Sequence, residues 1–216
     1  MGNFFFSVFI RLIVVFTALP IHEYAHGWVA RKLGDPTAEH MGRLNLNPLQ
    51  HFDPIGTTCL LLTGYGWAKP VPINPSYFRN RKSGMALTAL AGPAANILLA
   101  IVWTLVYKCI AYFLPYQTFF SVLATAFSLM ASINISLAVF NLLPIPPLDG
   151  AKIFGYFLPD RIYWNVMQYE RQIAFILFAL LMFTPVLNVP LSFLSGLVNR
   201  LVQFLTGFVD LLARMV

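Results

Sequence analysis

Long apolar segments dominate the pattern of residues along this chain. Four of them are long enough to cross a bilayer, which takes roughly 17–25 residues in a helix. They are residues 4–31, 85–113, 119–143 and 173–189. Residues 55–64 are also apolar but too short to cross, so we expect a re-entrant or partly inserted segment there. Arg200 interrupts residues 191–216, and the pattern leaves open whether that stretch crosses the membrane or lies flat on it.

A proline-rich segment, residues 66–75, lies between the short apolar stretch and the second long one. Its prolines exclude a regular helix, because proline lacks a backbone N–H and clashes with the preceding turn. The β-branched residues Val71 and Ile73 favour an extended loop, a small β-hairpin or an edge strand. We therefore expect an all-α membrane protein, a polytopic helical bundle of about five to six transmembrane or re-entrant segments, with a small extended or β loop near residues 66–75.

Composition supports the membrane class. Apolar residues make up 58% of the chain and charged residues only 10%, whereas a soluble domain carries about 25% charged residues. The net charge of +6 does not indicate nucleic-acid binding, because no basic cluster is interleaved with exposed aromatic residues. The positive charges fall between apolar segments and suit the anionic headgroups of a lipid bilayer. Cys59 and Cys109 lack the CxxC spacing of a thiolate metal site.

The positive charges also predict an orientation in the membrane. Seven Lys and Arg residues lie within residues 31–82, while the opposite side offers little beyond Lys108. The positive-inside rule places residues 31–82 in the cytoplasm. Two further crossings return the chain to that side, so the ends of the first and third long segments share one face of the membrane.

A metal-binding pattern, His22-Glu-Tyr-Ala-His26, lies within the first apolar segment. Residues four apart on a helix share one face, so both imidazoles can reach one ion. Glu23 lies one position further round, where it can take a proton from an activated water. HExxH also occurs by chance in soluble helices. In a membrane span, however, each charged group costs about 2.5–3.5 kcal/mol, which indicates a functional purpose.

Two histidines leave a catalytic zinc site one ligand short, because such sites use three protein ligands and one open position. Asp149 follows the third apolar segment, in a stretch whose prolines break the helix and whose Gly150 permits a tight turn. The other candidates for the third ligand are Glu39, His40, His51 and Asp53.

The two motifs together resemble the site-2 protease family of intramembrane zinc metalloproteases. The second motif is Asn141-x-x-Pro-x-x-Pro-Leu-Asp-Gly150, and the match extends over most of residues 15–155. The resemblance implies one Zn²⁺ per chain, held by His22, His26 and Asp149. It also implies that Asn141 holds the substrate backbone near the metal.

The resemblance extends to other parts of the chain. The segment Gly92-Pro-Ala-Ala-Asn96 and the loop at 66–75 are similar to family elements. No segment is long enough for the PDZ domain of many members, which is typical of the short form found mainly in bacteria and archaea. Residues 1–216 are then expected to form one integral-membrane metalloprotease domain, with a catalytic core at about 4–155 and C-terminal helices at 170–216.

Two further candidate substrate-binding residues, Asn96 and His51, each have two interpretations. Asn96 either bonds between helices or contacts substrate. His51 is either structural or a donor to the transition state. The expected substrate is a transmembrane helix of another protein, which must unwind before its carbonyls are accessible, and the loop at 66–75 could hold the unwound stretch by strand addition.

The alternative function is a non-catalytic zinc-binding membrane scaffold or a metal transporter, since both can use intramembrane His and Asp. A transporter has little need of a Glu directly after the first His, which favours the protease. The sequence indicates neither the oligomeric state nor the identity of the substrate.

Overall fold

The computed structural model describes residues 2–63 and 66–215. Over these ranges the chain is helical, without a strand. The helices are α1 Gly2–Lys32, α2 Thr37–His40, α3 Pro48–His51, α4 Pro54–Thr63, the 3₁₀ helix η1 Pro75–Tyr77, α5 Arg81–Phe113, α6 Thr118–Asn141, α7 Asp149–Gly155, α8 Asp160–Met167, α9 Glu170–Phe183, α10 Asn188–Leu205 and α11 Gly207–Ala213.

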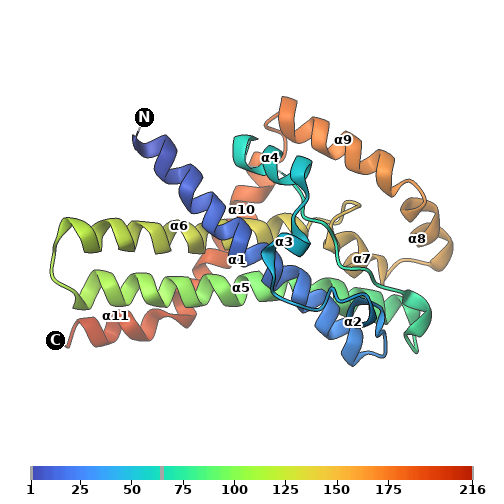
Figure 1. Cartoon of the computed structure of the whole chain (residues 1–216), viewed down its shortest axis with the longest axis horizontal. Helices are drawn as coiled ribbons and strands as arrows, with labels where there is room; N and C mark the ends of the chain where they lie inside the picture. Colours follow the sequence, from blue (N-terminus) through green and yellow to red (C-terminus); the bar gives the residue numbers. More distant parts are fainter. Residues whose placement is uncertain (1, 64–65, 216) are drawn as a thin grey trace.

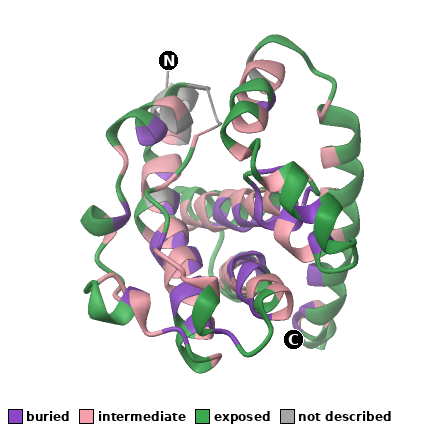
Figure 2. Cartoon of the chain, turned by 90° about the vertical axis from the view of Figure 1, so that its right-hand side faces the viewer, coloured by how far each residue is buried: buried purple, intermediate pink, exposed green. Residues whose placement is uncertain are grey.

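The core of the fold is the antiparallel pair α5 and α6, with α1 packed obliquely across it (Figure 1). Ile10, Val14 and Ala18 of α1 are buried together with Met130 of α6. Buried residues line the inner faces of these helices, and exposed residues cover their outer faces (Figure 2). This packing fixes α1, which carries the HExxH pattern, against both α5 and α6.

Among the described residues, three helices are long and apolar enough to cross a membrane: Val8–Lys32 within α1, Arg81–Phe113 and Thr118–Asn141. α10 and α11 pass the same test only as a pair, with a bend of 49° between them. Large apolar side chains project outward from these helices, as Leu98 does with 64% of its surface exposed, which suits contact with lipid. The predicted all-α class is confirmed, and each of the first three predicted spans forms a helix that is long and apolar enough to cross a membrane.

The predicted fourth span at residues 173–189 is wrong in its extent. α9 has only 14 residues and ends at Phe183, and it is not among the helices able to span a membrane. Thr184 adopts an extended conformation, because the ring of Pro185 disfavours helical geometry in the residue before it. The short apolar segment forms α4, a helix of 10 residues, which is too short to cross a membrane.

The predicted small β loop is not found. Residues 66–74 carry no regular secondary structure, and their backbone groups bind scattered partners. The Lys69 N–H donates to the His51 carbonyl at 2.9 Å, and the Asn74 N–H donates to Oδ2 of Asp35 at 2.7 Å. A strand needs a neighbouring strand, and this loop is bound instead to α1, to α3 and to Asp35, which lies between α1 and α2.

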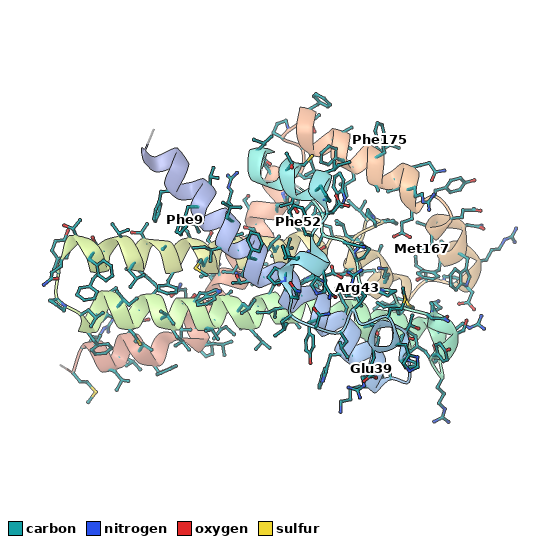
Figure 3. The ribbon with its side chains drawn as sticks, in the orientation of Figure 1. Phe9, Glu39, Arg43, Phe52, Met167 and Phe175 are labelled. Atoms are coloured by element: carbon teal, nitrogen blue, oxygen red, sulfur yellow. The ribbon has the colours of Figure 1, made fainter. Side chains whose placement is uncertain are left out.

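Polar residues gather at the end of the molecule where α2 lies. Arg31 binds Glu39 at 2.8 Å, and Arg43 donates to the Lys69 carbonyl at 3.0 Å. Glu39 and Arg43 lie at this end, whereas Phe9 lies on the other half of α1 (Figure 3). The HExxH pattern is in the half of α1 that leads to the polar end.

Candidate metal centre

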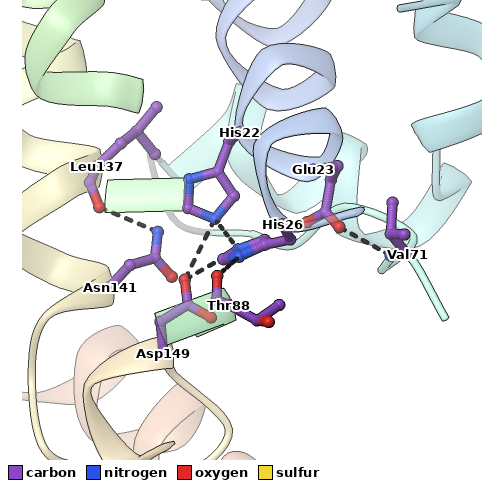
Figure 4. Close-up of polar contacts among 8 residues, drawn as sticks. All are labelled: His22, Glu23, His26, Val71, Thr88, Leu137, Asn141 and Asp149. Carbon is purple, nitrogen blue, oxygen red and sulfur yellow. Dashed lines mark hydrogen bonds and ion pairs between the residues drawn. The ribbon is translucent and has the colours of Figure 1, made fainter. Parts of the chain in front are cut away.

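His22 and His26 project from one face of α1, as their spacing predicted. Their Nε2 atoms lie 3.0 Å apart, and their rings meet edge to face with centroids 4.6 Å apart. Both side chains are buried. The two ring nitrogens therefore converge on one point inside the protein (Figure 4).

Asp149 completes the cluster from the start of α7. Its Oδ2 lies 3.3 Å from Nε2 of His22 and 3.2 Å from Nε2 of His26. A Cβ at Gly150 would collide with the carbonyl oxygens of Leu142 and Leu143. Glycine at this position lets α7 begin tightly against the end of α6, which brings the Asp149 carboxylate to the histidines.

The three atoms fit a metal ion. A tetrahedral zinc site with ligand distances of about 2.0–2.2 Å places its ligands roughly 3.3–3.5 Å from one another. The observed separations of 3.0, 3.3 and 3.2 Å are close to this triangle. Three acceptor atoms at such distances repel unless a positive charge lies between them. Within the described part of the chain, His22, His26 and Asp149 are the one group of His, Cys, Asp and Glu side chains with this convergence.

The protonation states also suit metal binding. The Nδ1–H of His26 donates to the Thr88 carbonyl at 2.7 Å, which leaves its Nε2 unprotonated and free to act as a ligand. Burial alone would raise the pKa of Asp149, but the adjacent imidazoles of His22 and His26 outweigh burial and hold that pKa below its ordinary value. The carboxylate therefore remains ionised.

Gly92 of α5 makes room for the two imidazoles. A Cβ built at this position would lie 2.5 Å from Cε1 of both His22 and His26, and closer still to Nε2 of His26. Real Cβ atoms essentially never approach other atoms so closely. The absence of a side chain at Gly92 is therefore a condition for the cluster, because α5 forms its wall.

His22 differs from His26 in its second ring nitrogen. Nδ1 of His22 is buried and has no hydrogen-bond partner among the described residues. Asn96 lies one turn along α5 from Gly92, is 1% exposed and has neither amide atom paired within the described ranges. Thr88, Gly92 and Asn96 are spaced four apart and so share a face of α5. That face meets the histidines.

Glu23 lies beside the cluster and is held by the loop at 66–74. Its Oε2 accepts the Val71 N–H at 2.8 Å (Figure 4). The carboxylate is partly exposed, in contrast to the buried ligands. The geometry keeps Glu23 adjacent to the candidate metal centre without placing it among the three converging atoms.

Asn141 is the last residue of α6. Its Nδ2 donates to the Leu137 carbonyl at 3.0 Å, and its amide points toward the cluster of His22 and Asp149 (Figure 4). The prolines that follow it end the helix, as expected. The amide nitrogen is bound to the helix, and the amide oxygen is the end that faces the site.

The other candidates for the third ligand have partners elsewhere. Nε2 of His51 lies 2.9 Å from the Asn45 carbonyl, and Oδ1 of Asp53 accepts the Gly56 N–H at 2.7 Å. Glu39 binds Arg31, and His40 is exposed. None of the four joins the convergent group found among the described residues.

Sequence reasoning missed three contributors to the site: the Thr88 carbonyl, the space at Gly92 and the Val71 N–H. Backbone groups carry no residue-type signal, so Thr88 and Val71 could not be found from the sequence. For Gly92 a signal was present, because it stands four residues before Asn96 in an apolar helix where a glycine costs stability.

Comparison with known proteins agrees with this geometry. Residues 109–184 match the model of peptidase family M50. The chain is 42% identical over 178 residues to "Putative zinc metalloprotease YwhC" of Bacillus subtilis, covering 82% of this chain and 80% of the relative. It is 33% identical over 160 residues to the similarly named MJ0611 of Methanocaldococcus jannaschii, covering 71% and 74%.

A third relative, Rip2 of Mycolicibacterium smegmatis, is 30% identical over 178 residues, covering 79% of this chain and 65% of the relative. No solved structure matches the chain. The identity to YwhC over most of both chains, together with the family match, shows that the chain belongs to peptidase family M50, the site-2 protease family.

Proposed function

We propose that this chain is an intramembrane zinc metalloprotease that hydrolyses peptide bonds within or near transmembrane segments of other membrane proteins. The observation that carries the proposal is the convergence of His22 and His26 with Asp149 of α7. The two histidines and Glu23 lie on α1, a helix apolar enough to cross a membrane. The names of the relatives, which call them zinc metalloproteases, support zinc as the metal.

Each residue has a distinct role in this proposal. His22, His26 and Asp149 would hold one zinc ion, which supplies a Lewis acid and lowers the pKa of a bound water. Glu23 accepts a proton from the attacking water and returns it to the leaving amine. The Val71 N–H orients the Glu23 carboxylate, and the Thr88 carbonyl holds the ring of His26. Asn141 binds the substrate backbone through its amide oxygen.

The loop at 66–74 is proposed to hold the unwound substrate. Its contact with Glu23 through Val71 supports this role, because a segment bound there lies next to the general base. Pro72 leaves its carbonyl as an acceptor, whereas the Pro70 carbonyl already accepts from Arg43 at 3.3 Å. Both prolines lack an N–H, which prevents continuous pairing with another copy of the loop. Extended backbone in a membrane needs such partners, since lipid offers none.

We further propose a multi-pass topology with the active site toward the cytoplasmic side. Three candidate spans and the Lys and Arg residues at 31–82 support this orientation by the positive-inside rule. The polar end of the molecule, near α2, is then the cytoplasmic end. The substrate would reach the site from within the bilayer.

The experiment that tests the function compares the chain with Glu23→Gln. The variant should keep about one zinc per chain by elemental analysis, yet lose peptide cleavage by roughly a thousandfold or more, because general-base catalysis and its return step both fail. His22→Ala, His26→Ala and Asp149→Ala should each lower zinc content. A comparison of membrane proteomes from cells with active and Glu23→Gln enzyme should show the substrate accumulating in the latter.

Metal flux through vesicles separates the protease from a transporter. Zinc uptake that depends on His22 and Asp149, with no cleavage of any membrane protein, would favour the transporter. Zinc retention with neither flux nor cleavage would indicate a scaffold.

A further inference from the structure

α10 carries a continuous stripe of polar side chains along one face. With 3.6 residues per turn, these side chains fall within an arc of about 80° on the helix. They are Asn188, Ser192, Ser195, Asn199 and Gln203. Leu191, Val198 and Val202, on the adjoining face, pack against α5 and α6. The polar stripe therefore runs beside the packed face of α10 rather than away from the protein.

A second stripe runs along α6. Ser128, Ser132 and Ser136 are spaced four apart and share one face of that helix. Ser132, Ser136 and Ser195 line two cavities, of about 530 Å³ and 470 Å³. The cavities therefore form one groove with shared walls on α6 and α10. Arg11 of α1 lines the first cavity, and Thr104 of α5 lines the second.

Several polar side chains of this groove make no hydrogen bond in the described part of the chain. Ser136 and Ser192 bond back to carbonyls of their own helices. The side chains of Ser132, Ser195 and Asn199 make no hydrogen bond to any described residue, and neither does the hydroxyl of Thr104, a residue only 2% exposed. At membrane depth such groups bind polar partners rather than lipid chains.

One end of the groove is lined by residues that are close in sequence to the metal-centre residues. Leu19, Leu137 and Phe140 line the first cavity. Leu19 is three residues from His22, and the Leu137 carbonyl holds the amide of Asn141. The other end lies at Gln203. The rise of a helix is about 1.5 Å per residue, which places Gln203 about 22 Å from Asn188 along α10. This length covers most of the hydrocarbon thickness of a bilayer, which is about 30 Å.

We propose that this groove, formed by α6 and α10, seats the transmembrane helix of the substrate and selects helices that carry a stripe of Ser, Thr, Asn or Gln. The proposal rests on the proposed function and names its substrate class. Paired rows of hydroxyl and amide groups fit a helix with a matching row, because interhelical hydrogen bonds stabilise helix pairs in lipid. A helix seated there would have one end beside Leu137, whose carbonyl holds the amide of Asn141.

The test measures binding without cleavage. Full-length Glu23→Gln protein, labelled with a donor dye, is reconstituted in phosphatidylcholine and phosphatidylglycerol vesicles with acceptor-labelled peptides. One peptide is a Leu/Ala helix of about 22 residues with Ser or Asn at every third or fourth position. The matched peptide has Leu and Ala throughout. Energy transfer should show the polar-striped peptide bound roughly tenfold more tightly.

A triple variant, Ser192→Ala, Ser195→Ala and Asn199→Ala, should remove that preference. The control variant changes Phe193, Leu197 and Phe204 to Ala on the opposite, exposed face of α10, and should keep it. Zinc content and helical content by circular dichroism should match in both variants.

Three results would overturn the proposal. Equal binding of both peptides would mean that the groove holds water or lipid. If both variants lost the preference, the preference would depend on the packing of α10 as a whole and not on its polar side chains. Energy transfer between two labelled copies of the chain, abolished by the triple variant, would assign the groove to self-association. Because the readout is binding, an enzyme that cleaves nothing would contradict the proposed function and leave the result for the groove intact.

Discussion

The Val71 N–H donates to Oε2 of Glu23 across 48 residues of sequence, at 2.8 Å. The contact joins the irregular loop at 66–74 to the helix that carries both histidines. Lys69, two residues earlier, is tied to His51 on α3, and Asn74 is tied to the buried Asp35. The loop is therefore fixed on both sides of Val71, and the proposed general base has one preferred orientation.

Replacing Val71 with Pro should slow cleavage without loss of zinc. Proline has no N–H, so the carboxylate of Glu23 loses a hydrogen bond worth about 1.5–3 kcal/mol. The expected fall in kcat/KM is roughly ten- to a hundredfold, measured on any cleaved membrane substrate. Val71→Ala, which keeps the N–H, is the control and should stay within about threefold of the parent. Equal activity of all three proteins would show that this contact does not orient Glu23.

Gly92→Ala should abolish tight zinc binding. The added methyl group would lie 2.5 Å from Cε1 of both histidines, so α1 and α5 must separate or the rings must rotate away. Gly196→Ala on α10 is a matched control, since a Cβ there meets nothing within 4 Å. Elemental analysis and thermal unfolding of both variants should show zinc loss only for Gly92→Ala. Full zinc retention by that variant would mean that the histidines can shift without cost.

Asn96→Ala should weaken zinc binding by about ten- to a hundredfold. A ligating histidine usually donates its second ring N–H to a fixed acceptor. Thr88 serves His26 in this way, and Asn96 is the buried amide one turn beyond Gly92, on the side of His22. We expect its oxygen to accept the His22 Nδ1–H through one water, because the two groups do not bond directly. Competition with a zinc-binding dye measures the affinity.

Asn134→Ala is the control for this prediction. Asn134 is also a buried amide, but on α6, where its Nδ2 donates to the Met130 carbonyl. This variant should lose stability without losing zinc affinity. If both variants lost zinc equally, the effect of Asn96 would be one of helix packing.

Asn141→Ala should bind zinc normally and cleave slowly. Its amide nitrogen is held by the Leu137 carbonyl, so the oxygen is fixed toward the site and can accept an N–H of the substrate. Loss of this positioning should reduce kcat/KM by roughly ten- to a hundredfold. Asn141→Asp keeps an oxygen acceptor and should recover part of the activity. Zinc loss in Asn141→Ala would instead favour a structural role in ending α6.

The sequence by itself predicted the main helices and the three side chains that converge at the candidate metal centre. His22 and His26 share a face because the spacing of four residues is a local property of any helix. Three apolar segments predicted α1, α5 and α6, because length and hydropathy suffice for a membrane span. Pro144 and Gly150 predicted the helix break and the tight turn that position Asp149. The predicted span ran to residue 189, whereas α9 ends at Phe183. Pro185 is the signal for this end, but apolar residues continue after it.

Only the tertiary structure decided which distant groups meet these residues. The space at Gly92 has meaning only once α5 lies against α1, and the Val71 N–H carries no side-chain signal at all. The predicted β loop failed for a related reason, since β-branched residues favour an extended backbone but only a neighbouring strand makes a ladder. The serines of α6 likewise become a groove only when α10 sets its own polar stripe beside them, because contact between separate helices depends on packing and not on local spacing.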